Sequence, residues 1–214
     1  MDSLRRELDE ATPRFQEAVD LVTTHVRYLL RRYGLIHRDE VNHRVTGRVK
    51  TVDRCIAKIK RVEKREQLQM ESLRDVERHI DDLAGIRVVC PYLTDVALVY
   101  GYICRHRAFR EIPNKFEDYI AEAKSGYRGL HTVVRTSTSS GTTKCEVQMR
   151  TGLQDAWAVK SHALVYKLKK TEFERLPLEL RHLLIQQSDS LYNEDKNAVS
   201  IAALVKKYVK IGSR

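Results

Sequence analysis

Two adjacent carboxylates, Asp81 and Asp82, precede Gly85 and an apolar run that contains Arg87. A carboxylate at the start of a buried strand, beside a glycine that permits close backbone approach, is one way to hold Mg²⁺ against a phosphate group. An Asp-Asp pair before a strand is also typical of an ordinary turn. This pattern is therefore compatible with either a metal–phosphate site or a turn.

A second group with chemical potential lies in residues 117–131, where Gly126 and Gly129 surround Tyr127. The tyrosine ring could stack on a nucleotide base, with Lys124 and Arg128 contacting phosphate. The alternative is a mobile surface loop whose Tyr and His side chains pack locally.

Residues 145–150 alternate strictly between apolar and polar side chains, as expected for a strand with two different faces. The polar set is Glu146, Gln148 and Arg150. Such a face is either a solvated outer surface, which is the more ordinary outcome, or the floor of a polar pocket.

Positive charge is concentrated in residues 44–65, which hold nine basic and two acidic side chains in a chain of net charge +10. At about 100° per residue, five of the basic side chains fall on one helical stripe, apart from the apolar residues. The stripe consists of Lys50, Arg54, Lys58, Arg61 and Arg65. It indicates a surface for a polyphosphate or a nucleic-acid backbone, with a solvated helix face as the alternative.

Hydrophobic periodicity predicts the elements that must position these groups. We expect helices at residues 3–33 (with a possible break at Pro13), 51–67, 73–80, 94–107 (capped by Thr94), 155–167, 178–192 and 195–208. We expect strands at residues 86–90 and 116–120, a hairpin of residues 130–136 and 143–150, and a connecting loop at 34–47. This order predicts an α+β fold with a small mixed β-sheet flanked by helices.

Composition narrows the class of protein. The 214 residues are 42% hydrophobic, which suits one domain with appended helices and argues against wholesale disorder. No apolar run is long enough to span a bilayer, and the N-terminus lacks a signal-peptide pattern. The four cysteines show no zinc-finger spacing, so we expect reduced thiols, a cytoplasmic location and no membrane association.

Five motifs occur in the order and approximate spacing seen in RelA/SpoT-type alarmone synthetases, over residues 44–170. They are Arg48-Val-Lys50, Asp82-Leu-Ala-Gly-Ile-Arg87, Asp118-Tyr-Ile with Lys124-Ser-Gly-Tyr-Arg-Gly-Leu-His131, Glu146-Val-Gln-Met-Arg-Thr151, and Trp157-Ala followed by His162 and Tyr166-Lys167. The chain resembles the small members of that family. The resemblance implies a nucleotidyltransferase-like synthetase domain at residues 35–170, an N-terminal helix at 1–34, and C-terminal helices at 171–214 that pack on the domain or on a partner subunit.

The resemblance also implies an activity: ATP-dependent transfer of the β,γ-diphosphate to the 3′-hydroxyl of GDP or GTP, which yields (p)ppGpp and AMP. The resemblance further implies that Asp82 and Glu146 are catalytic and bind Mg²⁺, and that Glu146 accepts the proton of the attacking hydroxyl. ATP would be bound by Arg48, Lys50, Lys58, Arg61 and Arg87, with Arg48 and Arg87 around the adenine. The acceptor nucleotide would be bound by Lys124, Tyr127, His131 and Gln148.

The sequence does not determine the identity of the acceptor substrate. The family's usual Pro-Lys-Pro-Asn-Gly-Tyr is here Ala-Lys-Ser-Gly-Tyr, one residue shorter, and Lys160 replaces a common acidic residue. The alternatives are a toxic relative that modifies the 3′-CCA end of tRNA, an enzyme with an adenine-nucleotide acceptor, and a non-catalytic nucleotide- or RNA-binding module. By family analogy a homo-oligomer such as a tetramer is expected, and an antitoxin partner is compatible with the toxic alternative.

Overall fold

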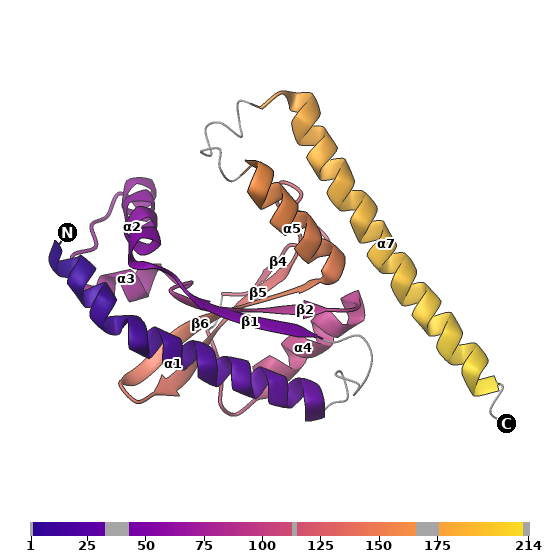
Figure 1. Ribbon diagram of the computed structural model, residues 1–214, viewed down its shortest axis with the longest axis horizontal. Coiled ribbons are helices and arrows are strands. Elements are labelled where there is room, and N and C mark those ends of the chain that lie inside the picture. The colour runs from indigo at the N-terminus through magenta and orange to yellow at the C-terminus, as the bar shows by residue number, and fades with distance from the viewer. Residues whose placement is uncertain (1, 33–42, 113–114, 166–175, 212–214) are drawn as a thin grey trace.

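The apolar residues of the N-terminal segment recur at helical spacing and form one helix, α1 (Asp2–Arg32), in the computed structural model. The structure describes residues 2–32, 43–112, 115–165 and 176–211. Pro13 lies inside α1, and the helix continues through it, so the expected break is absent. The inner side of α1 is buried along its whole length, from Leu4 to Leu30, and runs along the central sheet (Figure 1).

The sheet is mixed and has six strands, with β1, β2, β6, β5 and β3 side by side and β4 also paired to β5. Its strands are β1 (Arg44–Val49), β2 (Ala84–Cys90), β3 (Arg110–Glu111), β4 (Glu117–Asp118), β5 (Leu130–Thr138) and β6 (Gly141–Thr151). Only β2 and β6 are parallel neighbours; the other pairs are antiparallel. The predicted α+β class with a mixed sheet and the predicted hairpin are confirmed.

Two of the predicted loop and strand assignments are corrected. The loop expected at residues 34–47 is wrong for Arg44–Gly47, which belong to β1, while residues 33–42 lie outside the described part. Of the strand expected at residues 116–120, only the two residues of β4 are strand, and β3 was not predicted. Such short edge segments gain their order from pairing with β5, which local sequence does not reveal.

The remaining helices are α2 (Val52–Glu66), α3 (Leu73–His79), α4 (Leu93–Arg105), α5 (Gly152–Val165) and α7 (Leu178–Ile211). Helix α4 begins after Tyr92, with no side-chain cap, so the expected Thr94 cap is wrong. Helix α5 begins at Gly152 instead of residue 155, and its expected last residues lie outside the described part. The two predicted C-terminal helices are one continuous helix, α7.

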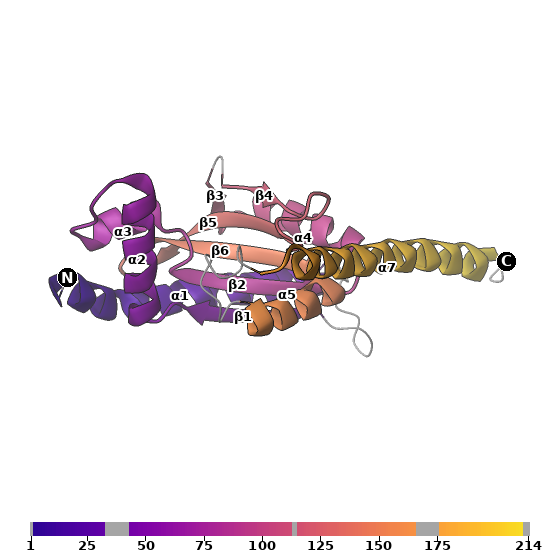
Figure 2. The ribbon, with the colours of Figure 1, turned by 90° about the horizontal axis from the view of Figure 1, so that it is seen from above.

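The two faces of the sheet differ in chemistry. The alternating apolar residues of β6, including Cys145, Val147 and Met149, are fully buried on the face that α1 and α4 cover. Helices α2 and α5 stand on the other side of the sheet, apart from each other, as Figures 1 and 2 show. The polar side chains of the central strands therefore lie on the face between α2 and α5.

Helix α7 packs on α5 and α4, and its C-terminal end extends away from the domain (Figure 1). Large apolar side chains towards that end are exposed: Ile201, Leu204, Val205 and Tyr208. None of the helices in the described part of the chain is both long enough and apolar enough to cross a membrane.

Candidate functional site

Strand register places the predicted site residues in rows across the polar face of the sheet. Arg48 on β1, Gly85 on β2 and Glu146 on β6 are direct cross-strand neighbours. One row further along, Gln148 on β6 lies between Arg87 of β2 and His131 of β5. Residues far apart in the sequence thus meet because β2 and β6 pair in parallel between β1 and β5.

Glu146 lies at the centre of this face with its carboxylate held by polar neighbours. Gln148 Nε2 donates to Glu146 Oε2 at 2.8 Å, and His131 Nδ1 lies 3.5 Å from Oε1. A Cβ atom at Gly85 would lie 3.8 Å from Oε2, an ordinary van der Waals contact, so the carboxylate lies directly beside the glycine backbone. A fixed, accessible carboxylate of this kind suits proton abstraction or metal binding.

Asp82 lies three residues before Gly85 and binds two ammonium groups. Lys50 Nζ is 2.6 Å from Oδ2, and Lys58 Nζ is 2.6 Å from Oδ1. Burial raises the pKa of Asp82, but hydrogen bonds and charge from both lysines outweigh it and lower the pKa below its usual value. Asp82 is therefore ionised at neutral pH and fixes two cations beside the polar face.

Asp82 and Glu146 offer the type of oxygen ligand that Mg²⁺ prefers. In the described part of the chain, no group of three or more His, Cys, Asp or Glu side chains forms a metal cage. Mg²⁺ bound with a nucleotide needs only one or two protein carboxylates, because phosphate oxygens and water complete its coordination. An ionised carboxylate has about four lone-pair sites, so Asp82 retains acceptor capacity beyond its two lysines.

The other residues that we predicted to bind ATP lie around Asp82 and its two lysines. Arg48 lies on β1, and Lys50 lies in the connection from β1 to α2, so Lys50 is not part of the helical stripe in which we placed it. Arg61 is exposed on α2 one turn after Lys58. The basic residues predicted to bind ATP are thus divided between a strand, a connection and a helix that all border the same face.

A buried carboxylate that sequence reasoning missed, Asp155, organises the arginines of this face. It lies in the first turn of α5, is 5% exposed and pairs with Arg150 at 2.7 Å. Arg44 is also bound to Asp155, and Arg87 lies 3.6 Å away. The alternation of β6 placed Arg150 on this face, but nothing local indicated its partner.

The predicted acceptor residues form an aromatic cluster beside this network. Tyr127 Oη and His131 Nε2 are 2.6 Å apart, so His131 bridges Tyr127 and Glu146. The Tyr127 ring packs steeply against the rings of Tyr119 and His131, and Arg150 lies over it at 5.9 Å. Burial raises the pKa of Tyr127, so its hydroxyl is neutral. Lys124 Nζ lies over the Tyr119 ring.

Helix α7 holds the loop that carries these residues. Ser188 Oγ donates to the Gly126 carbonyl at 2.5 Å, and a Cβ atom at Gly126 would lie 2.6 Å from Trp157 Cζ2. Gly126 also has φ +85°, which favours glycine. Arg128 is buried and bound to the Ile120 carbonyl and to Asp189. The expectation that Arg128 contacts phosphate is therefore wrong, because its donors secure the loop.

Asp81 forms a second lysine-binding carboxylate next to Asp82. Lys144 Nζ lies 2.5 Å from Asp81 Oδ1, and Lys115 Nζ lies 2.7 Å from Oδ2. Burial raises the pKa of Asp81, but the two lysines outweigh it and lower the pKa. The Asp81-Asp82 pair is thus more than a turn: it gathers four ammonium groups at one end of the polar face.

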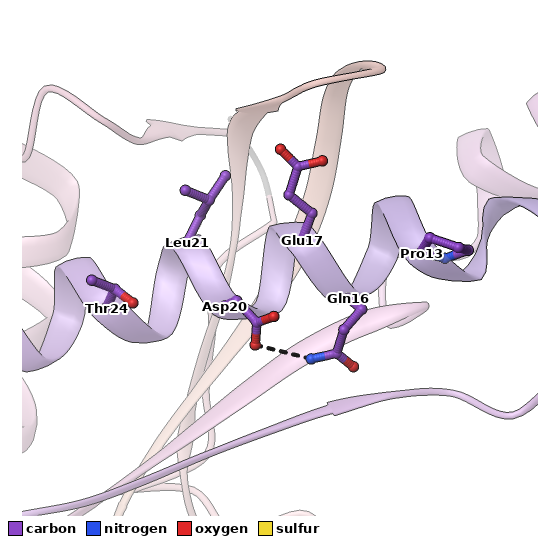
Figure 3. A pocket seen from close by; sticks show the side chains of 6 residues that line it. All are labelled: Pro13, Gln16, Glu17, Asp20, Leu21 and Thr24. Atoms are coloured by element: carbon purple, nitrogen blue, oxygen red, sulfur yellow. Dashed lines mark hydrogen bonds between the residues drawn. The ribbon is translucent and has the colours of Figure 1, made fainter.

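A shallow hollow on α1 is unrelated to this chemistry. It is lined by Pro13, Gln16, Glu17, Asp20, Leu21 and Thr24 (Figure 3). Gln16 donates to Asp20 within the helix, and Glu17 accepts hydrogen bonds from the backbone and side chain of Ser139. Glu17 thus secures the tip of the β5–β6 hairpin on the helix that covers the apolar face.

The known proteins to which this chain is similar all point to one family. A family model described as a region found in RelA / SpoT proteins matches residues 47–171. GTP pyrophosphokinase YwaC of Bacillus subtilis is 28% identical over 172 residues, which cover 78% of this chain and 79% of that protein. GTP pyrophosphokinase YjbM of the same organism is 32% identical over 142 residues, which cover 64% of this chain and 63% of that protein.

Solved structures agree. Small alarmone synthetase 1 of Bacillus subtilis, crystallised with its product pppGpp, superimposes with a TM-score of 0.72 at 28% identity, covering 90% of this chain and 94% of that chain. A GTP pyrophosphokinase family protein of Streptococcus pneumoniae gives a TM-score of 0.74 at 26% identity, covering 94% of this chain and 95% of that chain.

Proposed function

Because this chain belongs to the RelA/SpoT family and has the fold of its small alarmone synthetases, we propose that it transfers the β,γ-diphosphate of ATP to the 3′-hydroxyl of GDP or GTP. The products would be (p)ppGpp and AMP. The observation that carries the proposal is the polar face of the sheet. Glu146, Asp82 with its two bound lysines, and the Tyr127 cluster lie together there.

In this proposal the donor nucleotide occupies the side of the face formed by β1, β2 and α2. Lys50 and Lys58, which Asp82 already holds in place, bind the ATP phosphates together with Arg61. Arg48 and Arg87 lie on paired strands at the edge of the face and pack against the adenine. Asp155 keeps the Arg87 guanidinium within this face.

The acceptor nucleotide occupies the side formed by β5, β6 and the loop after β4. Tyr127 stacks on its base, and Lys124, His131 and Gln148 surround it. Glu146 takes the proton of the 3′-hydroxyl, whose oxygen then attacks the β-phosphorus of ATP. The bond from that phosphorus to the oxygen bridging the α- and β-phosphates breaks, and AMP leaves with the electron pair.

Asp82 and Glu146 are the residues that would hold Mg²⁺, which supplies neutralisation of the negative charge at the transferred diphosphate when bound. Gln148 and His131 keep the Glu146 carboxylate in place beside Gly85. The surrounding cations offset the repulsion between two polyphosphate chains brought close together.

The acceptor can be identified directly. Purified protein is incubated with Mg²⁺, ATP labelled at the γ-phosphate, and GDP, GTP, ADP or deacylated tRNA. We expect label on GDP or GTP. Label on tRNA without label on guanine nucleotides would assign the chain to the tRNA-modifying alternative, and label on ADP would assign an adenine acceptor. Label on none of them, with nucleotide still bound, would favour a non-catalytic binding module.

A further inference from the structure

The Asp81 cluster has no role in the activity proposed above. Lys144 comes from β6 and Lys115 from the segment before β4, yet both ammonium groups meet on one carboxylate. The arrangement repeats that of Asp82, which holds Lys50 and Lys58. Two cations on one carboxylate leave a net positive charge, so the cluster can still attract an anion.

The cluster borders the acceptor side of the face. Lys144 precedes Glu146 by two residues and shares its strand face, at a distance of about 7 Å along the strand. Lys115 lies two residues before Glu117, which pairs with His131 of the acceptor side. By contrast, Lys50 and Lys58 reach Asp82 from the β1–α2 side.

The proposed placement of the acceptor gives it a direction along β6. Its base lies at Tyr127, towards the end of β6 that leads into α5, and its 3′-hydroxyl lies at Glu146. The 5′-phosphates then continue beyond the ribose, towards the end of β6 that carries Lys144. At this end the residues assigned to the acceptor supply no cation, since Lys124 lies in the loop beside Tyr127 and Arg128 is held by Asp189.

We propose that Lys115 and Lys144 form a second phosphate-binding subsite, which takes the 5′-phosphate groups of the acceptor nucleotide. The inference rests on the proposed function, because the direction of the acceptor follows from it. Asp81 is a positioning residue in this subsite: it holds the two ammonium groups at this end of the polar face before the nucleotide binds. The subsite would make acceptor use depend on the number of 5′-phosphates.

The test compares GMP, GDP and GTP as acceptors at saturating ATP, in the wild type and in the Lys115→Gln/Lys144→Gln double variant. The wild type should use GDP and GTP with a much higher kcat/KM than GMP. In the double variant we expect kcat/KM for GDP and GTP to fall about ten- to a hundredfold, GMP to change little, and KM for ATP to stay the same. Lys60→Gln, which removes an exposed charge from α2, is the matched control.

A Lys115→Arg/Lys144→Arg variant and a melting curve show whether a loss comes from charge or from misfolding, because arginines keep both cations. A double variant with an unchanged preference for GDP over GMP, or with a raised KM for ATP, would overturn the inference. Calorimetric titration with GDP, and with guanosine for comparison, distinguishes failure of this subsite from failure of the proposed transfer activity. Weaker GDP binding by the double variant supports the subsite even if the wild type transfers no diphosphate, whereas equal binding by both proteins contradicts it.

Discussion

Replacement of Glu146 by Gln is expected to slow diphosphate transfer by about a hundredfold or more, while ATP binding persists. The amide keeps the size of the side chain and still accepts a hydrogen bond from Gln148, so the geometry of the face is preserved. It cannot take up the proton of the 3′-hydroxyl at neutral pH. The measurement is kcat from AMP release, together with calorimetric binding of a non-hydrolysable ATP analogue.

Glu122→Gln is the matched control, because Glu122 is an exposed carboxylate in the loop after β4, and it should leave both quantities unchanged. Retained turnover in Glu146→Gln would remove Glu146 from the role of base. Loss of ATP binding in that variant would contradict the expected separation of turnover from binding, because the Mg²⁺ that Glu146 would help to hold would then be needed for ATP affinity.

Replacement of Asp155 by Asn is expected to lower the free energy of unfolding by about 3–5 kcal/mol, because it leaves the buried Arg150 without a counter-charge. Arg150 is 3% exposed and Asp155 is 5% exposed, so water cannot replace the lost partner. Arg44 and Arg87 lose the same carboxylate, and their repulsion adds to the effect. Urea denaturation followed by circular dichroism measures the change.

Asp53→Asn provides the comparison, since its ion pair with Arg5 lies on the exposed surface and should contribute less than about 1 kcal/mol. If Asp155→Asn proved no more destabilising than Asp53→Asn, Asp155 would not organise the arginines of the polar face.

The hydrophobic pattern of the sequence was sufficient to predict the elements with a regular apolar periodicity. The alternation of residues 145–150 predicted the buried apolar side of β6, although Arg150 of the polar set is buried as well, and the apolar spacing before residue 33 predicted α1. Strand β1 was missed because its residues are mostly exposed and include Gly47, whose added Cβ would lie 2.3 Å from Val19 Cγ1. Only the packing of α1 on the sheet reveals that requirement.

The site residues were likewise predicted only in part from local sequence. The motifs named Asp82, Glu146 and Tyr127, but the cross-strand rows that place Arg48, Gly85 and Glu146 side by side depend on the order of the strands. The contacts of Asp155 and Asp81 join elements that lie far apart in the chain, so no local spacing encodes them. Arg128 shows the opposite error, since a cation in a glycine-containing loop is here a buried structural group.

The central claim is that this polar face moves an intact diphosphate from ATP to a guanine nucleotide. Its most direct test uses ATP labelled only at the β-phosphate, with GDP as the acceptor. The account predicts that the label passes to the guanine nucleotide and that AMP appears in equal amount. Label that remains in ADP, with no labelled guanine nucleotide formed, would contradict it.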